Sequence, residues 1–219
     1  MKAIFFLLTL LLTQPLLADW VMVQKTSIEG QGEPQDITIK LKGDEARMDL
    51  GTQMTLLSNS TTGEMKMYLH AQKMVMNMNG DTVKTAMALA GQFLGKMDEK
   101  ANKPKATGQK EKIGSYEAEI YSWKGKLGAG KFWVAANFPN YQALNALQDK
   151  MSKAMGNPAA SLAPQSSDFP GMVVKSEMKM LGKTTLTELV SAKEEAVSDD
   201  VFKAPEGYQE MKLPSLPGK

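Results

Sequence analysis

Residues 64–79 read EMKMYLHAQKMVMNMN, and on both sides of His70 this stretch alternates methionine with other residues. Successive side chains of a β-strand point to opposite faces, so the pattern predicts a β-hairpin with its methionines on one face. Residues 172–181 repeat the pattern late in the chain. The apolar face predicted from these three strands consists of Met65, Met67, Leu69, Met74, Met76, Met78, Met172, Val174, Met178 and Met180.

A face built from methionine has particular packing properties. The side chain is unbranched and polarizable, so it fills irregular apolar space and adapts to different partners. Such a face suits either a loosely specified core or a pocket for an apolar ligand. The ten residues of this face are therefore the candidate ligand-binding site.

Two segments have the spacing of amphipathic helices, with apolar residues every three or four positions. The first is predicted to begin at Asp81 or Thr82 and to end near Asp98, and the second to follow Asn140 and stop at Gly156. The side chains expected to cover the sheet as a lid are Val83, Met87 and Leu94 from the first helix and Leu144, Leu147 and Met151 from the second. The next segment, 157–171, is rich in Pro, Ala and Ser and is predicted to be a loop that can act as a flap over a pocket.

Short alternating stretches account for most of the remaining chain. Residues 36–42 and 45–50, for example, alternate apolar with polar side chains and are separated by Gly43-Asp44, as in a hairpin. We expect about ten or eleven strands in an antiparallel sheet, which together with two helices makes an α+β fold.

The beginning of the chain indicates its compartment. Residues 1–18 have one lysine, an apolar run and a small residue at the end, the order of a secretory signal peptide cleaved after Ala18. Residues 19–219 then form a single domain without a transmembrane segment, located in the periplasm or secreted. The chain has no cysteine, and its formal net charge of +2 argues against nucleic acid as a partner.

Catalytic motifs are absent from the sequence. His70 is the only histidine, is expected at an exposed turn, and is accompanied by no Gly-x-Ser-x-Gly motif. The prediction is a protein that is not an enzyme and uses no cofactor.

Three segments resemble a known family. They are 107–118 (TGQKEKIGSYEA), 131–135 (KFWVA) and the tail 197–211 (VSDDVFKAPEGYQEM), in which Phe202 and Tyr208 are the apolar anchors. The chain resembles an uncharacterised family of exported bacterial proteins of unknown function, which is similar in turn to the LolA/LolB-like fold of lipoprotein carriers. The resemblance implies a strongly curved half-barrel whose concave apolar face is covered by the helices and accepts an acyl chain. It supplies no catalytic residues.

These observations leave three functions open. The first is a non-catalytic binding protein for an apolar ligand such as a lipid or acyl chain. The second is a structural or protein-interaction domain whose methionines form a closed core, with a partner that the sequence does not identify. The third is Cu(I) binding, because thioethers are soft ligands and Met-x-Met places two sulfurs on one face of a strand.

Overall fold

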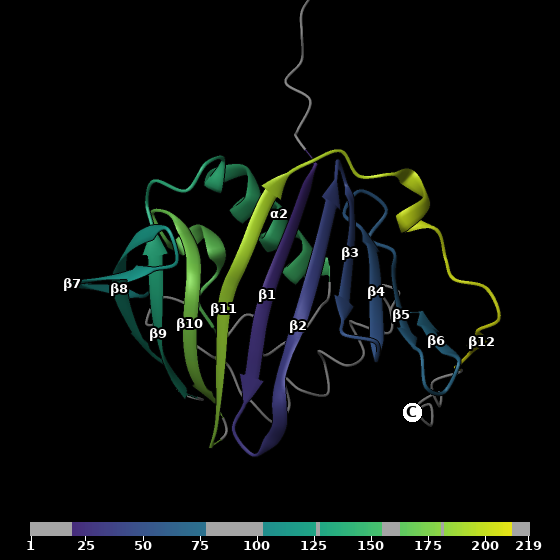
Figure 1. The fold of residues 1–219 in the computed structure, drawn as a ribbon, viewed down its shortest axis with the longest axis horizontal. Helices are drawn as coiled ribbons and strands as arrows, with labels where there is room; N and C mark the ends of the chain where they lie inside the picture. Colours follow the sequence, from purple (N-terminus) through teal and green to yellow (C-terminus); the bar gives the residue numbers. More distant parts are fainter. Residues whose placement is uncertain (1–18, 78–102, 126–127, 155–162, 181, 212–219) are drawn as a thin grey trace, which may run out of the picture.

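The protein is built on one large β-sheet, seen in a computed structural model that describes residues 19–77, 103–125, 128–154, 163–180 and 182–211. Twelve strands lie in the order β12-β6-β5-β4-β3-β2-β1-β11-β10-β9-β8-β7 (Figure 1). Their bounds are β1 (Trp20–Ile28), β2 (Gln31–Lys42), β3 (Glu45–Leu50), β4 (Met54–Asn59), β5 (Met65–Leu69), β6 (Met74–Asn77), β7 (Lys105–Ile113), β8 (Tyr116–Lys124), β9 (Gly128–Ala135), β10 (Met172–Met180), β11 (Lys183–Glu194) and β12 (Gln209–Glu210). The sheet is open, with β12 and β7 at its edges.

Neighbouring strands are antiparallel, except that β12 pairs with β6 in parallel. The count of twelve described strands corrects the expected ten or eleven, and the additional strand is β12. Strand β7 lies at the other edge, and all its side chains before Ile113 are exposed. An edge strand that buries so little gives no alternation of apolar and polar residues to detect.

Helix α2 (Tyr141–Ala154) confirms the second predicted helix. Leu144 is buried and Leu147 half-buried in the main core cluster, so α2 covers the sheet with the face that the periodicity indicated. Met151 lies on α2 in a stretch whose side chains are not described. The first predicted helix, with Val83, Met87 and Leu94, lies outside the described residues, as do Met78 and the signal peptide. Two covering helices are therefore not shown.

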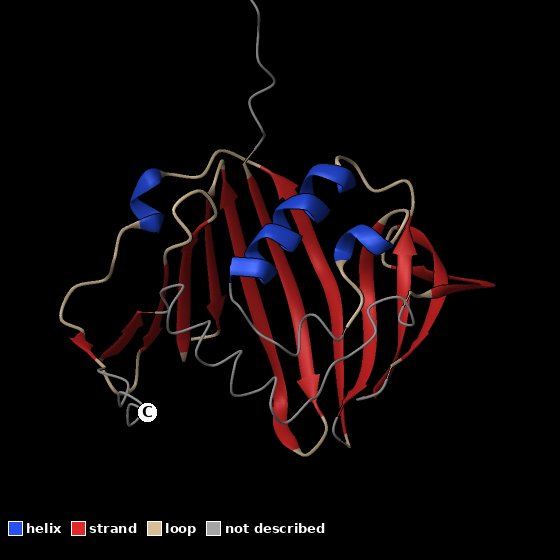
Figure 2. Cartoon of the chain, turned by 180° about the vertical axis from the view of Figure 1, so that it is seen from behind, coloured by secondary structure: helices blue, strands red, loops and turns tan. Residues whose placement is uncertain are grey.

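Two short 3-10 helices complete the described elements, η3 (Ser166–Asp168) and η4 (Asp199–Phe202). Figure 2 shows α2 and η3 on the same side of the sheet. In the part of the chain that the structure describes, no helix has the length and apolar character needed to cross a membrane.

The described part of the predicted flap is attached to α2. The Asn145 side-chain amide donates to the carbonyls of Ser166 and Gly171 at 2.9 and 3.1 Å. The Asp149 carboxylate accepts from the backbone N–H groups of Ser166 and Ser167 at 2.8 and 3.1 Å. Residues 166–171 are thus held against α2 by two polar side chains one helical turn apart, and the role of the loop as a flap stays a prediction.

A C-terminal strap, residues 197–211, runs along the outside of β3 to β6 (yellow in Figure 1). Near its start the Lys42 ammonium donates to the Val197 carbonyl at 2.8 Å. At its end β12 adds to the free edge of β6, where the backbone N–H of Met211 donates to the Val75 carbonyl at 2.8 Å. The strap closes an edge that the β-hairpin would otherwise leave unpaired.

Candidate ligand-binding site

The predicted apolar face divides into two parts with different packing. Met172 and Val174 are each 1% exposed and belong to the main core cluster together with Leu144 of α2. Met22 on β1 is fully buried in the same cluster. This part of the face is a filled core, because side chains of the chain itself occupy all the contact surface of these residues.

The hairpin part of the face is less completely covered. Met65 is buried, whereas Met67, Leu69, Met74 and Met76 are half-buried. Met67 lies directly opposite Met76, and Leu69 opposite Met74, so the four side chains share one face as the alternation predicted.

The strand register extends this face onto β4 and β3. Leu69 is paired with Met54, and Met54 with Leu50. Both new members are half-buried. Sequence reasoning missed Leu50 and Met54 as site residues, although the alternation through residues 46–50 was visible, because only the pairing register shows which face of one strand continues onto the next.

A hollow of about 610 Å³ lies at the end of the sheet where these strands turn. Its apolar lining is Leu50, Met54, Leu69 and Ala71, and the remaining lining residues are Thr52, Gln53, His70 and Gln72. No Asp, Glu, Lys or Arg is among these eight residues. The site is therefore an apolar surface with a rim of neutral amides, a hydroxyl and an imidazole.

Strand β10 does not carry one continuous methionine face. Its pairing with β9 shifts register between Val173 and Lys175. Met172 and Val174 belong to the main cluster, whereas Met178 packs against a second cluster formed by Trp123, Phe132, Val134 and Phe169. Met180 is half-buried at the far end of the strand. The prediction that these four residues form one surface is wrong, because the β-bulge redistributes them among different neighbours.

The single histidine, His70, lies at a turn as the sequence predicted, but the expectation that it is exposed is wrong, because its side chain is half-buried. Its Nδ1 contacts the Tyr208 hydroxyl of the strap, and its Nε2 lies 3.0 Å from Thr55 Oγ1. The Thr55 hydroxyl donates to Asp49 at 2.6 Å, so His70 Nε2–H must donate to Thr55. In the neutral ring, Nδ1 is then the acceptor of a hydrogen bond from the Tyr208 hydroxyl. Arg47 completes this polar network by donating to Asp49 at 2.8 Å and to the Val201 carbonyl at 2.8 Å.

The polar network fastens the strap to the sheet. Thr55, its only hydroxyl apart from Tyr208, is 1% exposed and has no access to a substrate. The order Asp-Thr-His-Tyr also leaves no free general base beside an accessible nucleophile. What this arrangement can do chemically is hold residues 201 and 208 against β3 to β5.

Asp49 makes this network sensitive to acid. Burial raises the pKa of its carboxyl, but hydrogen bonds from Arg47 and Thr55 outweigh burial and hold the pKa below the ordinary value of 3.8. Since the folded-state pKa is the lower one, the carboxylate stabilises the fold above about pH 4, and this stabilisation is lost as the pH falls through the folded-state value.

We expect Asp49→Asn to lower the free energy of unfolding by about 1 kcal/mol at pH 7 and by less at pH 3. Urea unfolding of both proteins at the two pH values measures the difference. Asp36→Asn is the matched control, because the Asp36 carboxylate is exposed and lies 3.8 Å from Lys25. An Asp49→Asn effect that is the same at both pH values would contradict the assignment.

Within the described part of the chain, His, Asp and Glu side chains form no group of three that could hold a metal ion. The direct pairing of Met67 with Met76 places two thioethers on one face of neighbouring strands. Cu(I) binding by this pair stays a prediction.

Comparison with protein families gives one match, over residues 20–208, to a domain of unknown function (DUF4412). The chain belongs to this family. The match covers nearly the whole region in which the strands and α2 lie, so the described sheet is the DUF4412 domain. The resemblance to a family of unknown function is thereby confirmed. The DUF4412 chain has no match among curated proteins.

Solved structures similar to the DUF4412 chain are distant. PNGF-II is 14% identical with a TM-score of 0.42; the match covers 88% of this chain but only 30% of PNGF-II. A LolA superfamily protein from Nitrosomonas europaea is 10% identical with a TM-score of 0.34, covering 87% and 92% of the two chains. The lipoprotein LppX of Mycobacterium tuberculosis is 9% identical with a TM-score of 0.41, covering 81% and 88%. These likenesses assign no ligand to the DUF4412 chain.

Proposed function

We propose that this protein is a non-catalytic binding protein for an apolar ligand such as a lipid or acyl chain, exported to the periplasm or the cell exterior. The observation that carries the proposal is the hollow of about 610 Å³ at the turn end of β3 to β6. Leu69 lines the hollow and shares one face of β5 and β6 with the half-buried Met67, Met74 and Met76. This methionine surface therefore adjoins the hollow. In this proposal the sheet forms a strongly curved half-barrel, and the ligand lies on its methionine side.

The size and chemistry of the hollow support an extended apolar ligand. Small-molecule sites in proteins have volumes of about 300–1,000 Å³ and are lined mainly by apolar side chains. Leu50, Met54, Leu69 and Ala71 supply the apolar half of the lining, and the side chain of Met54 adapts to chains of differing shape. The absence of Asp, Glu, Lys and Arg from the lining favours the uncharged part of a ligand at this place.

The packing of α2 limits where on the sheet a ligand can bind. Leu144, Met172 and Val174 lie in a filled core, so the ligand is not held between α2 and the sheet at these residues. The same filled core favours the second candidate, a structural or protein-interaction domain with a closed methionine-rich interior. The two candidates differ in whether the hairpin part of the face accepts a ligand.

A substitution that fills the hollow distinguishes the two candidate functions. We expect Met54→Trp to weaken binding of a fluorescent fatty acid by about 5- to 150-fold, because the larger ring occupies the ligand's volume. Val190→Trp is the matched control, since Val190 is 60% exposed on β11 and does not line the hollow. The measurement is fatty-acid displacement, with native mass spectrometry of the protein purified from its own cell envelope.

Each outcome has a separate meaning. Wild-type protein that carries no lipid and binds no fatty acid would contradict the proposed function and support the closed structural domain. Binding that Met54→Trp leaves unchanged would retain the function and exclude the hollow as its site.

A further inference from the structure

The C-terminal strap is fastened on both sides of a short bridge. Before the bridge, the Arg47 guanidinium donates to the Val201 carbonyl at 2.8 Å, and Asp199 pairs with Lys42 at 2.6 Å. After it, the Tyr208 ring packs edge-on against Tyr68 with the ring centroids 5.2 Å apart. Residues 202–207 therefore cross the outer face of β4 and β5 between two fixed points.

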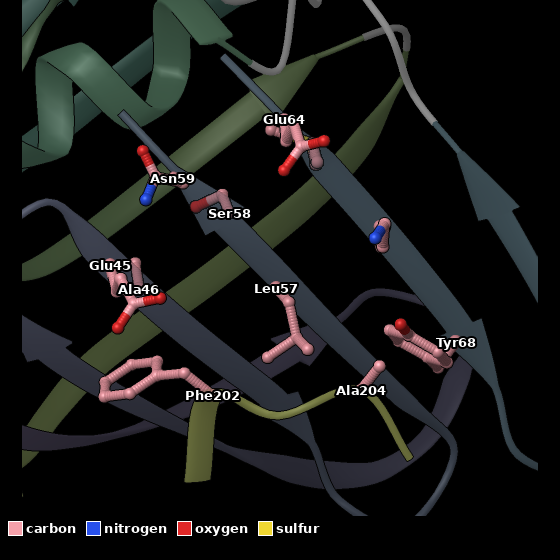
Figure 3. A pocket seen from close by; sticks show the side chains of 11 residues that line it. Glu45, Ala46, Leu57, Ser58, Asn59, Glu64, Tyr68, Phe202 and Ala204 are labelled. Carbon is pink, nitrogen blue, oxygen red and sulfur yellow. The ribbon is translucent and has the colours of Figure 1, made fainter. Parts of the chain in front are cut away.

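A pocket of about 150 Å³ lies between this bridge and the sheet. Phe202 and Ala204 line it from the strap, and Leu57 and Tyr68 line it from β4 and β5 (Figure 3). Leu57 of β4 pairs with Lys66 of β5, and Lys66 and Tyr68 are two positions apart on the same strand. The side chains of all three therefore lie on the face of the sheet that the strap crosses. The pocket shares no lining residue with the hollow at the turn end, so the two sites are independent.

The pocket as a whole has room for one small group. A cavity of about 150 Å³ is large enough for a benzene molecule, which is about the size of a leucine or phenylalanine side chain. Because the strap is fastened on both sides, this space is present before a ligand arrives. The small side chain of Ala204 contributes to it, since a larger residue there would project into the same volume.

The rim of the pocket carries charges of both signs. Glu45 and Glu64 supply carboxylates, and Lys66 supplies an ammonium. The Tyr68 ring is 2% exposed, and burial raises the pKa of its hydroxyl, which makes no hydrogen bond within the described part of the chain. Tyr68 thus offers a neutral phenol that can donate to a carboxylate or accept from an ammonium.

We propose that this pocket binds a free α-amino acid with an apolar side chain of leucine or phenylalanine size. The side chain occupies the space between Leu57, Tyr68 and Phe202. The ammonium of the ligand faces Glu45 and Glu64, and its carboxylate faces Lys66. A zwitterion presents one group to each sign of rim charge, its ammonium to the two carboxylates and its carboxylate to Lys66, whereas a simple amine or acid has a counterpart for only one sign.

The test uses three ligands of nearly equal shape with the full-length mature protein: L-leucine, isopentylamine and 4-methylpentanoate. NMR shifts of Phe202, Ala204 and Tyr68 are followed as each ligand is added up to tens of millimolar. We expect saturable binding of L-leucine, and binding of each singly charged analogue that is about two- to fivefold weaker, as exposed ion pairs allow.

Three variants locate the site and its charge recognition. Ala204→Leu should abolish binding, whereas Ala106→Leu, the same change at an exposed position on edge strand β7, should leave it intact. Glu64→Gln should reduce the preference for L-leucine over 4-methylpentanoate, because it removes one carboxylate that faces the ammonium. This variant changes an exposed side chain and leaves the apolar lining in place.

The proposal is overturned if L-leucine shows no saturable binding, if either singly charged analogue binds as tightly as L-leucine, or if Ala204→Leu binds as wild type does. None of these results depends on fatty-acid binding at the hollow, so failure here and failure of the proposed function are distinguishable.

Discussion

Met172→Ala is expected to lower the free energy of unfolding by about 2–5 kcal/mol, the cost of truncating a methionine in a filled core. Met172 is among the largest fully buried side chains and contacts the cluster that includes Leu144 and Val174. Since small domains are stable by only about 5–15 kcal/mol, this change removes a large share of the total. Urea unfolding monitored by circular dichroism measures it.

The matched control is Met76→Ala on the hairpin. Met76 is half-buried and lies opposite Met67, so truncating it removes less buried area, and we expect a loss of about 1 kcal/mol or less. Equal losses for the two variants would show that both parts of the methionine face are equally filled. That result would remove the packing argument for a ligand at the hairpin.

Tyr208→Ala is expected to destabilise the protein by about 2–4 kcal/mol through loss of the strap's main anchor. The ring packs edge-on against Tyr68, the Lys73 ammonium lies 5.0 Å from its centroid, and its hydroxyl contacts His70 Nδ1. Without the ring, β12 keeps only a short pairing with β6, in which the backbone N–H groups of Gln209 and Met211 donate to the carbonyls of Lys73 and Val75.

Tyr208→Phe separates the ring from the hydroxyl. It keeps the aromatic packing and removes only the bond to His70, so a loss of about 0.5–1.5 kcal/mol is expected. Hydrogen exchange at the β6 amides should rise strongly in Tyr208→Ala and little in Tyr208→Phe. Unchanged exchange in Tyr208→Ala would show that the strap stays bound by its other contacts and that Tyr208 is not its main anchor.

Local periodicity in the sequence determined the elements that bury one face. The alternation in residues 65–77 correctly placed Met67 and Met76 on one side of a hairpin, because a strand in an antiparallel sheet has a period of two. The spacing of Leu144 and Leu147 correctly identified α2 and the side it buries. These predictions needed no knowledge of which segments meet.

Features that depend on distant segments were not predictable in this way. His70 and Tyr208 are separated by 138 positions, so nothing near His70 indicates that its ring is bonded on both sides. Strand β12 likewise exists only where the strap meets the free edge of β6. Its two residues, Gln209 and Glu210, are both exposed and have no pattern of their own.

The sequence by itself determined that methionines would share faces of β-strands, because that follows from the backbone geometry of one segment. Only the tertiary structure decided that Met172 lies in a filled core, that Met178 lies in a second cluster, and that Met74 is partly open beside a hollow. The reason is physical. A methionine side chain is chemically the same at all three places, and its environment depends on strand register, on the bulge between Val173 and Lys175, and on which segments pack opposite it.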